Sequence, residues 1–159
     1  MDDETSAPAR AEKTRDTFRM TCAVRCAIRA TPRSRLGPLT DAAGFPRWNS
    51  TVTSIEGEIA LGRTLAIKVP AAPNRVFKPK VSRVESGRSM VWSEGTAPMF
   101  AGVRTFTLTP NDDGTTDFAM QEELSGLMLP MVKRSLPDFA PVFEAYAADL
   151  KRAAEGGAS

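Results

Sequence analysis

The clearest hydrophobic pattern in the chain lies near its N-terminus, where apolar residues alternate with polar ones. Between positions 18 and 28 the apolar side chains are Phe18, Met20, Cys22, Val24, Cys26 and Ile28. Successive side chains of a β-strand point to opposite faces of a sheet, so this alternation predicts a long strand with one face on the core. The intervening residues, among them Arg19, Arg25 and Arg29, are expected on the other face.

A second pattern, with the period of a helix, occupies the last quarter of the chain. Its apolar residues, at alternating steps of three and four, are Leu129, Val132, Leu136, Phe139, Phe143, Tyr146 and Leu150. This spacing predicts an amphipathic helix whose apolar stripe needs a broad apolar surface. Pro137 and Pro141 each remove a backbone donor, so we expect a bend or break between residues 134 and 141. In an alternative interpretation the helix begins near Pro137, and residues 127–135 form a separate turn.

Between these two segments, alternating apolar residues and turn signals predict antiparallel strands joined by hairpins. One or two short helical turns are expected over residues 36–43, and the segment 45–50 then turns the chain into the next strand. The predicted strands are 52–56, 65–69, 76–84, 90–94, 100–109 and 116–124. Pro79 interrupts the third of them, as is typical of an edge strand or a bulge. These elements predict an α+β protein in which a sheet wraps round the C-terminal helix.

The turn between the last two predicted strands fixes their register. Asp112, Asp113 and Gly114 form a three-residue loop, with glycine where a positive φ is needed. This loop places Arg104 directly opposite Glu122, on the same face as the apolar residues of both strands. The same arithmetic across residues 96–98 places Trp92 opposite position 102, where a glycine leaves room for the indole.

Composition indicates a globular protein of one domain. The chain has 159 residues, of which 42% are hydrophobic, enough for a proper core. We expect a disordered tail over residues 1–16, one domain over 17–154 and a flexible C-terminus over 155–159. No apolar run approaches the roughly 20 residues that span a bilayer, so no integral membrane segment is expected. The first residues lack the basic-then-apolar order of a secretory signal, and we expect a cytoplasmic protein.

Charge and cysteine content argue against two further classes of protein. A net charge of +2, with scattered arginines, is too small to indicate nucleic-acid binding. Cys22 and Cys26 lie four residues apart on a predicted strand, about 13 Å from one another, so both are expected to be buried free thiols. Two cysteines and no histidine leave nothing from which to build a zinc site. We expect neither a metal nor a cofactor.

The sequence offers few groups for catalysis. It has no histidine, no serine in a nucleophile-elbow context and no phosphate-cradling glycine loop. Inward-facing Arg104 and Glu122 are the sharpest candidates, because such charges are costly unless they are paired. In one interpretation they orient the polar end of an apolar ligand, with Arg104 binding a carboxylate or an enolate-like oxygen. In the other they form a structural ion pair or lie at the solvated rim. Glu94 shares the face of Trp92 and could join them.

Several short motifs and their order resemble a known superfamily. The motifs are FPRWNS at 45–50, GxxL at 62–65, WxxG at 92–95, and ELSG at 123–126 leading into LMLP at 127–130. Over about residues 17–154 the chain resembles the SRPBCC (START/Bet v1-like) superfamily, within it the polyketide cyclase/dehydrase and lipid-transport group. The resemblance implies the helix-grip fold. In that fold a curved antiparallel sheet grips a long C-terminal helix, two short helices follow the first strand, and a deep apolar cavity lies between sheet and helix.

The resemblance also implies a function in that cavity. We expect the chain to bind a small hydrophobic molecule, such as a lipid or a polyketide, without converting it. The alternative is a cyclase/dehydratase-type enzyme with Arg104, Glu122 and Tyr146 as candidate catalytic residues. A third possibility is a protein-binding module of the co-chaperone kind. The identity of the ligand, the presence of a reaction and the oligomeric state stay open.

The cavity hypothesis assigns a set of mostly aromatic and methionine side chains to the ligand-binding wall. They are Trp48, Met90, Trp92, Phe100, Arg104, Phe106, Phe118, Met120, Glu122, Leu124, Met128, Phe139 and Phe143. A filled core without a cavity has the same pattern, so for any one apolar residue both interpretations stay open. The methionines and aromatics favour a surface that can repack around a ligand.

Overall fold

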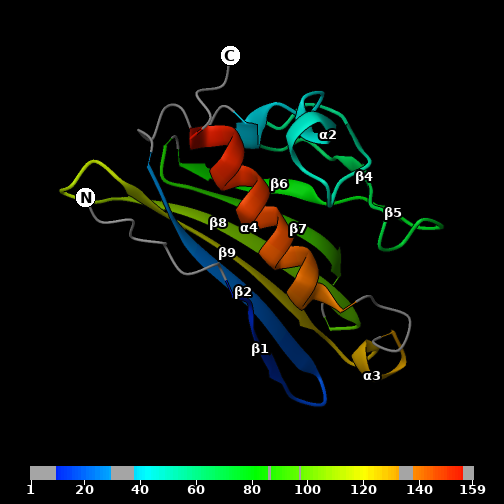
Figure 1. Cartoon of the computed structure of the whole chain (residues 1–159). Coiled ribbons are helices and arrows are strands. Elements are labelled where there is room, and N and C mark those ends of the chain that lie inside the picture. The colour runs from blue at the N-terminus through cyan, green and yellow to red at the C-terminus, as the bar shows by residue number, and fades with distance from the viewer. Residues whose placement is uncertain (1–9, 30–37, 86, 97, 133–137, 156–159) are drawn as a thin grey trace.

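The structure is a computed structural model that describes residues 10–29, 38–85, 87–96, 98–132 and 138–155. A large antiparallel sheet, a smaller three-stranded sheet and a long C-terminal helix make up its architecture (Figure 1). The helix lies diagonally across one face of the large sheet, and the small sheet lies beside its upper part. The predicted α+β helix-grip fold is therefore confirmed.

The large sheet has the strand order β1-β2-β9-β8-β7-β6. Its strands are β1 (Glu12–Arg15), β2 (Arg19–Ile28), β6 (Lys80–Glu85), β7 (Ser89–Thr96), β8 (Phe100–Pro110) and β9 (Thr116–Ser125). The small sheet consists of β3 (Ser54–Glu56), β4 (Ala66–Lys68) and β5 (Val76–Phe77). The helices are α2 (Phe45–Trp48), α3 (Leu129–Val132) and α4 (Phe139–Glu155).

The strand β2 confirms the period-two pattern, with two differences. Phe18 precedes the strand and is 50% exposed, because it lies in the turn after β1. Cys22 is buried, whereas Cys26 is only half-buried, so the prediction of two buried thiols is wrong for Cys26. Both cysteines are free, and burial raises the pKa of each to about 11. They are therefore protonated and unreactive at neutral pH.

The strand β1 lies within the segment 1–16, for which the sequence predicted a disordered tail, so residues 12–15 of that segment are ordered. Residues Glu12–Arg15 pair with the outer edge of β2 in antiparallel register. The backbone N–H of Ala11 donates to the Glu144 carboxylate, and Lys13 forms an ion pair with Asp138 at 3.0 Å. The segment is polar and exposed, so it lacks the alternation of apolar and polar residues by which a strand could be predicted. It forms a strand because the open edge of β2 supplies partners for its backbone hydrogen bonds. Residues 1–9 lie outside the described part of the chain.

The middle of the chain differs from the predicted single meander. The strands β3, β4 and β5 form their own sheet, and backbone hydrogen bonds join the segment 62–65 to Pro79 and to Val81 of β6. The prolines that precede β5 and β6 interrupt the ladder, as predicted for Pro79. The segment 45–50, predicted as a turn, contains the short helix α2. Of the expected helical turns at 36–43, residues 38–40 are helical, and 36 and 37 lie outside the described residues.

The register of the large sheet was predicted correctly for one hairpin and wrongly for the next. Arg104 lies directly opposite Glu122, as the three-residue turn required. Trp92, however, lies opposite Arg104, and Glu94 lies opposite Gly102. The ladder between β7 and β8 closes at the pair formed by residues 96 and 100, which shifts the register by two residues. Trp92, Arg104 and Glu122 consequently form one row across three strands.

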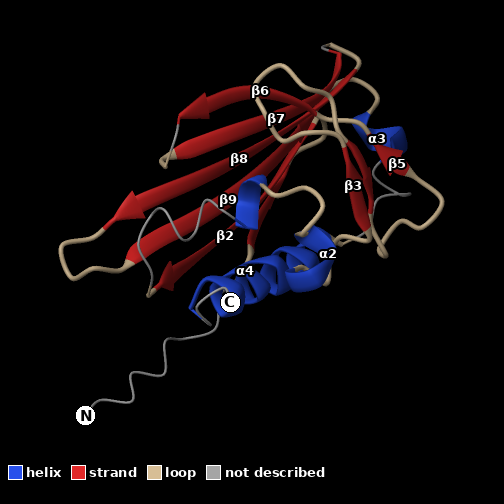
Figure 2. Cartoon of the chain, turned by 90° about the horizontal axis from the view of Figure 1, so that it is seen from above, coloured by secondary structure: helices blue, strands red, loops and turns tan. Residues whose placement is uncertain are grey.

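The C-terminal helical segment is divided into α3 and α4. Residue 138 is not helical and α4 begins at Phe139, so the helical pattern is interrupted within the predicted interval 134–141. Residues 133–137 lie outside the described part. The helix α4 ends at Glu155, one residue into the segment predicted to be flexible. The large sheet lies on one side of the helix (Figure 2). The buried apolar residues of α4 belong to the core, and they are Phe143, Tyr146, Ala147, Leu150 and Ala154. The sixth buried residue, Asp149, accepts hydrogen bonds from Ser50.

Candidate functional site

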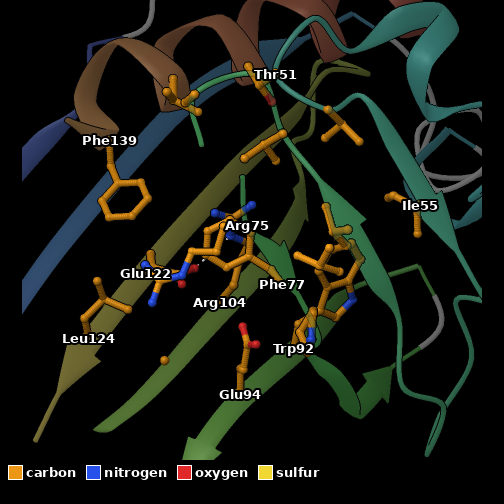
Figure 3. A pocket seen from close by; sticks show the side chains of 18 of the residues that line it. Thr51, Ile55, Arg75, Phe77, Trp92, Glu94, Arg104, Glu122, Leu124 and Phe139 are labelled. Atoms are coloured by element: carbon orange, nitrogen blue, oxygen red, sulfur yellow. Dashed lines mark hydrogen bonds and ion pairs between the residues drawn. The ribbon is translucent and has the colours of Figure 1, made fainter. Parts of the chain in front are cut away.

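A cavity of about 290 Å³ lies between the large sheet, the small sheet and the first turns of α4 (Figure 3). The larger sheet contributes Trp92, Glu94, Gly95, Phe100, Gly102, Arg104, Glu122 and Leu124. The segment from α2 to the start of β6 contributes Phe45, Thr51, Val52, Ile55, Ile67, Val69, Ala71, Arg75, Val76, Phe77 and Pro79. The helix α4 contributes Phe139, Val142 and Tyr146. Apolar side chains therefore dominate the wall, and a few charged groups interrupt it.

Gly102 leaves part of this space open. It lies within β8, between Glu94 on β7 and Leu124 on β9. A Cβ atom at this position would lie 3.0 Å from Leu124 Cδ2 and 3.5 Å from Glu122 Oε1. A larger side chain here would therefore occupy the cavity. The sequence had predicted that this glycine makes room for the Trp92 indole. In the structure it makes room for the cavity instead.

Arg104 and Glu122 form a largely buried ion pair on the wall. Arg104 Nε donates to Glu122 Oε2 at 2.8 Å, and the side chains are 23% and 16% exposed. The guanidinium carbon lies 5.1 Å from the centre of the Phe143 ring, an attractive cation–π arrangement. Burial alone would lower the pKa of Arg104, but the Glu122 carboxylate and its hydrogen bond raise it, and the net shift is upward. The pair is thus a fixed charged element of the cavity and not a solvated rim.

Glu94 brings a second carboxylate to the cavity. Its Oε1 accepts the backbone N–H of Lys78 at 2.7 Å. Figure 3 shows its carboxylate pointing toward Arg104, although the two side chains form no ion pair with each other. Arg75, an exposed residue whose guanidinium carbon lies 5.6 Å from the centre of the Phe77 ring, also lines the cavity. Two arginines and two glutamates of the described wall therefore balance in charge.

Tyr146 lines the cavity, but its hydroxyl does not reach the open space. The side chain is 1% exposed, and the hydroxyl has no hydrogen-bond partner among the described residues. Burial raises the pKa of the phenol well above its ordinary value, and the Arg104 charge lowers it only in part. The hydroxyl therefore stays protonated and covered by neighbouring side chains. This placement weighs against Tyr146 as a catalytic group.

Tyr146→Phe is expected to stabilise the ligand-free protein by about 1 kcal/mol, because it removes a buried hydroxyl that lacks a partner. The phenyl ring keeps its packing against Phe45, Trp48 and Phe106, whose ring centres lie 6.3, 5.9 and 6.2 Å from that of Tyr146. Urea denaturation of parent and variant measures the difference. A loss of stability would show instead that the hydroxyl has a partner in solution.

Several residues predicted for the ligand-binding wall do line the cavity. They are Trp92, Phe100, Arg104, Glu122, Leu124 and Phe139. They come from the rows of the large sheet that lie toward its α3 end and from the first turn of α4. Glu94, which the sequence suggested as a companion of Arg104, joins them.

The other predicted wall residues do not line it: Trp48, Met90, Phe106, Phe118, Met120, Met128 and Phe143. Most of them are buried in one core cluster with the inner face of α4, where side chains fill the space between helix and sheet. Trp48 packs on Phe45 with ring centres 4.8 Å apart, and Met128 lies in the turn before α3. For all of these residues except Met128, the filled-core interpretation is the one that fits the structure.

The sequence did not identify the wall that comes from the small sheet and its flanking loops. Ile55, Ile67 and Phe77 lie on strands of two or three residues, too short to show a period. The FPRWNS motif contained one usable signal, because Phe45 at its start lines the cavity. Among the described residues no group of histidine, cysteine, aspartate and glutamate is arranged to hold a metal ion. No helix in the described ranges is long and apolar enough to cross a membrane.

No protein-family model matches the chain, and no curated protein matches it in sequence. Several solved structures match it in three dimensions. A START superfamily protein from Mycobacterium smegmatis aligns with a TM-score of 0.63 at 15% identity, covering 86% of this chain and 97% of that protein. A norcoclaurine synthase point mutant from Thalictrum flavum, in complex with a transition state analogue, gives 0.68 at 14% identity, with coverages of 92% and 100%.

A third match is the Aha1 dimer from Colwellia psychrerythraea, with a TM-score of 0.65 at 18% identity and coverages of 87% and 98%. At these identities the likeness shows the fold and nothing finer. The names of the three proteins differ in kind, and a shared fold does not fix a function. The function has to be argued from the cavity itself.

Proposed function

We propose that this chain, which has the SRPBCC-type helix-grip fold, binds a small hydrophobic molecule in the cavity between its sheets and α4. The observation that carries the proposal is the cavity of about 290 Å³ with mostly apolar walls and a few charged groups. Ligand sites typically combine an apolar lining with a small number of polar groups that orient the ligand. Trp92, Phe100, Leu124 and Phe139 supply apolar contacts in this proposal, and Arg104 orients the polar end.

A cyclase/dehydratase-type reaction in the same cavity is the second candidate. It is favoured by the Glu94 carboxylate, which lines the same cavity wall as Arg104 and forms no ion pair with it. A carboxylate can take a proton from a carbon beside a carbonyl, and a guanidinium can stabilise the enolate oxygen that results. Mass spectrometry of a poly-β-ketone thioester incubated with the protein distinguishes conversion from simple binding.

Uptake of the neutral fluorescent probe N-phenylnaphthylamine tests the binding proposal. The probe is expected to gain fluorescence when it enters the cavity of the parent protein. Gly102→Val is expected to weaken probe binding roughly tenfold, about 1.4 kcal/mol, because the added methyl groups occupy the cavity beside Leu124. A fluorescence titration of parent and variant measures the change in Kd.

Ala101→Val is the matched control for this experiment. It adds a similar volume to the same strand, but residue 101 points to the opposite face of the sheet. Thermal melts of both variants show whether each one is folded. Equal probe binding by folded Gly102→Val, folded Ala101→Val and the parent would show that the probe does not use this cavity.

A further inference from the structure

The proposed function leaves open the polar group of the ligand, and the cavity constrains it. Resting on that proposed function, we infer that the ligand is a compact apolar molecule with a neutral hydroxyl group that bridges Arg104 and Glu94. In this arrangement the hydroxyl oxygen accepts a hydrogen bond from Arg104, and the hydroxyl hydrogen is donated to the Glu94 carboxylate. The ligand class is therefore an alcohol or a phenol on an apolar body.

The positions of the two charged side chains carry the first step. Arg104 lies on β8 and Glu94 on β7, in adjacent rows of the same face. Both line the cavity, and Figure 3 shows the Glu94 carboxylate pointing toward Arg104. The two nevertheless form no ion pair, in contrast to Arg104 and Glu122, whose atoms lie 2.8 Å apart. Gly102, directly opposite Glu94 and two residues before Arg104 on the same strand, supplies no side chain to this part of the wall.

The unused hydrogen-bonding capacity on each side defines the bridging group. Arg104 uses its Nε–H for Glu122, so the N–H groups of its two terminal nitrogens are not part of that bond. Glu94 uses Oε1 for the backbone of Lys78, and its second oxygen is not part of that bond. A group between them has to accept from the arginine and donate to the glutamate. A hydroxyl does both with one heavy atom.

Between Arg104 and Glu94, charge argues against a carboxylate or an ammonium group. A carboxylate would compete with Glu122 for Arg104 and would face Glu94, a second negative charge on the same wall. Like charges close to one another repel, and Glu94 is only half-buried, so this repulsion is partly screened by solvent. This inference places a hydroxyl oxygen at Arg104, whereas the sequence suggested a carboxylate or an enolate-like oxygen there. An ammonium group would satisfy Glu94 but offers no acceptor to Arg104.

The volume of the cavity also favours a compact ligand. A cavity of about 290 Å³ lies at the lower end of the range for pockets that hold drug-sized ligands. It suits a body of a few rings better than a lipid with two acyl chains. Val142 and Phe139 of α4 cover such a body from the side opposite the polar groups of the sheet.

Matched naphthalenes that compete with N-phenylnaphthylamine test the inference. The set carries a hydroxyl, a methyl, a methoxy, an aminomethyl or a carboxylate group at the same ring position. The naphthol is expected to displace the probe at about tenfold lower concentration than the methyl compound, because hydroxyl and methyl differ little in size and only the hydroxyl makes two hydrogen bonds. The methoxy compound, which accepts but cannot donate, is expected to lie between them, and the ammonium and the carboxylate are expected to bind more weakly than the naphthol.

Glu94→Gln keeps the size of the side chain and is expected to reduce the naphthol preference to about threefold, because a neutral amide oxygen is a weaker acceptor for the hydroxyl hydrogen than a carboxylate oxygen. Glu123→Gln is the matched control. Glu123 lies on β9, points to the opposite face of the sheet and pairs with Arg19 at 3.3 Å near the surface. This variant is expected to keep the full preference.

The possible results separate the two claims. If the parent protein takes up no N-phenylnaphthylamine, the binding proposal fails, and this inference fails with it. If the probe binds but the naphthol and the methyl compound compete equally, the binding proposal stands and only the inference of a bridging hydroxyl group is overturned. Tighter binding of the carboxylate or the ammonium, or an unchanged preference in Glu94→Gln, overturns it as well.

Discussion

Phe143→Ala is expected to lower the free energy of unfolding by about 3 to 5 kcal/mol, because it removes a large side chain from a filled core. Phe143 is fully buried in α4, in the core cluster that α4 forms with the large sheet. Its ring also contacts Phe139, with ring centres 6.1 Å apart, and lies under the Arg104 guanidinium. The substitution therefore removes apolar burial, an aromatic contact and a cation–π contact together. Urea denaturation followed by circular dichroism measures the loss.

Phe143→Leu is the control for this prediction. Leucine retains much of the buried apolar volume but has no ring, so its cost is expected to be clearly smaller than that of alanine. A similar cost for both variants would indicate that the ring contacts, and not the filled volume, dominate. If Phe143→Ala were as stable as the parent, α4 would not pack on the sheet as the structure has it.

Arg104→Ala is expected to cost about 3 kcal/mol, at the lower end of the range for breaking a buried ion pair. The partner Glu122 is 16% exposed, so its charge stays largely out of water when the guanidinium is removed. The variant also loses the contact with the Phe143 ring. Thermal and urea denaturation measure the effect. We expect ligand binding to weaken as well, because the same side chain faces the cavity.

Arg83→Ala provides the comparison. Arg83 on β6 pairs with Glu85 at 3.4 Å, and these side chains are 68% and 52% exposed. Loss of such a surface pair is expected to cost about 1 kcal/mol or less. Equal small costs at positions 83 and 104 would show that water reaches the Arg104 pair freely. The pair would then serve the ligand without stabilising the fold.

The sequence was sufficient for the register that places Arg104 opposite Glu122, because the turn at 112–114 ends in a glycine that fixes the loop length. It was insufficient for the neighbouring hairpin. The segment between residues 96 and 100 contains Pro98 but no glycine, so nothing in it marks where the ladder closes. Because of this error of two residues, the predicted register placed Gly102 opposite Trp92, whereas it lies opposite Glu94. The pairing of Arg104 with Glu122 could therefore be predicted from a local turn signal, and the position of Glu94 relative to Gly102 could not.

The cavity itself was only partly accessible to sequence reasoning. Alternation along β7, β8 and β9 identifies which residues face inward, but it does not show where α4 leaves the sheet uncovered. Phe106 and Arg104 face inward from the same strand, yet one lies in the filled core and the other on the cavity wall. The difference arises from how the helix and the small sheet are placed, which depends on contacts between segments far apart in the chain.

Gly102 gives the fold a simple route to a new ligand. Its backbone belongs to β8 and pairs with strands on both sides, so the ladder holds it in place whatever side chain it carries. It has an ordinary φ, so an L-amino acid fits there without backbone strain. One base change turns a glycine codon into an alanine or a valine codon. Evolution can therefore reduce the space inside this protein in single mutational steps that keep the strand pairing and require only that the Leu124 side chain, whose Cδ2 would lie 3.0 Å from the new Cβ, shifts.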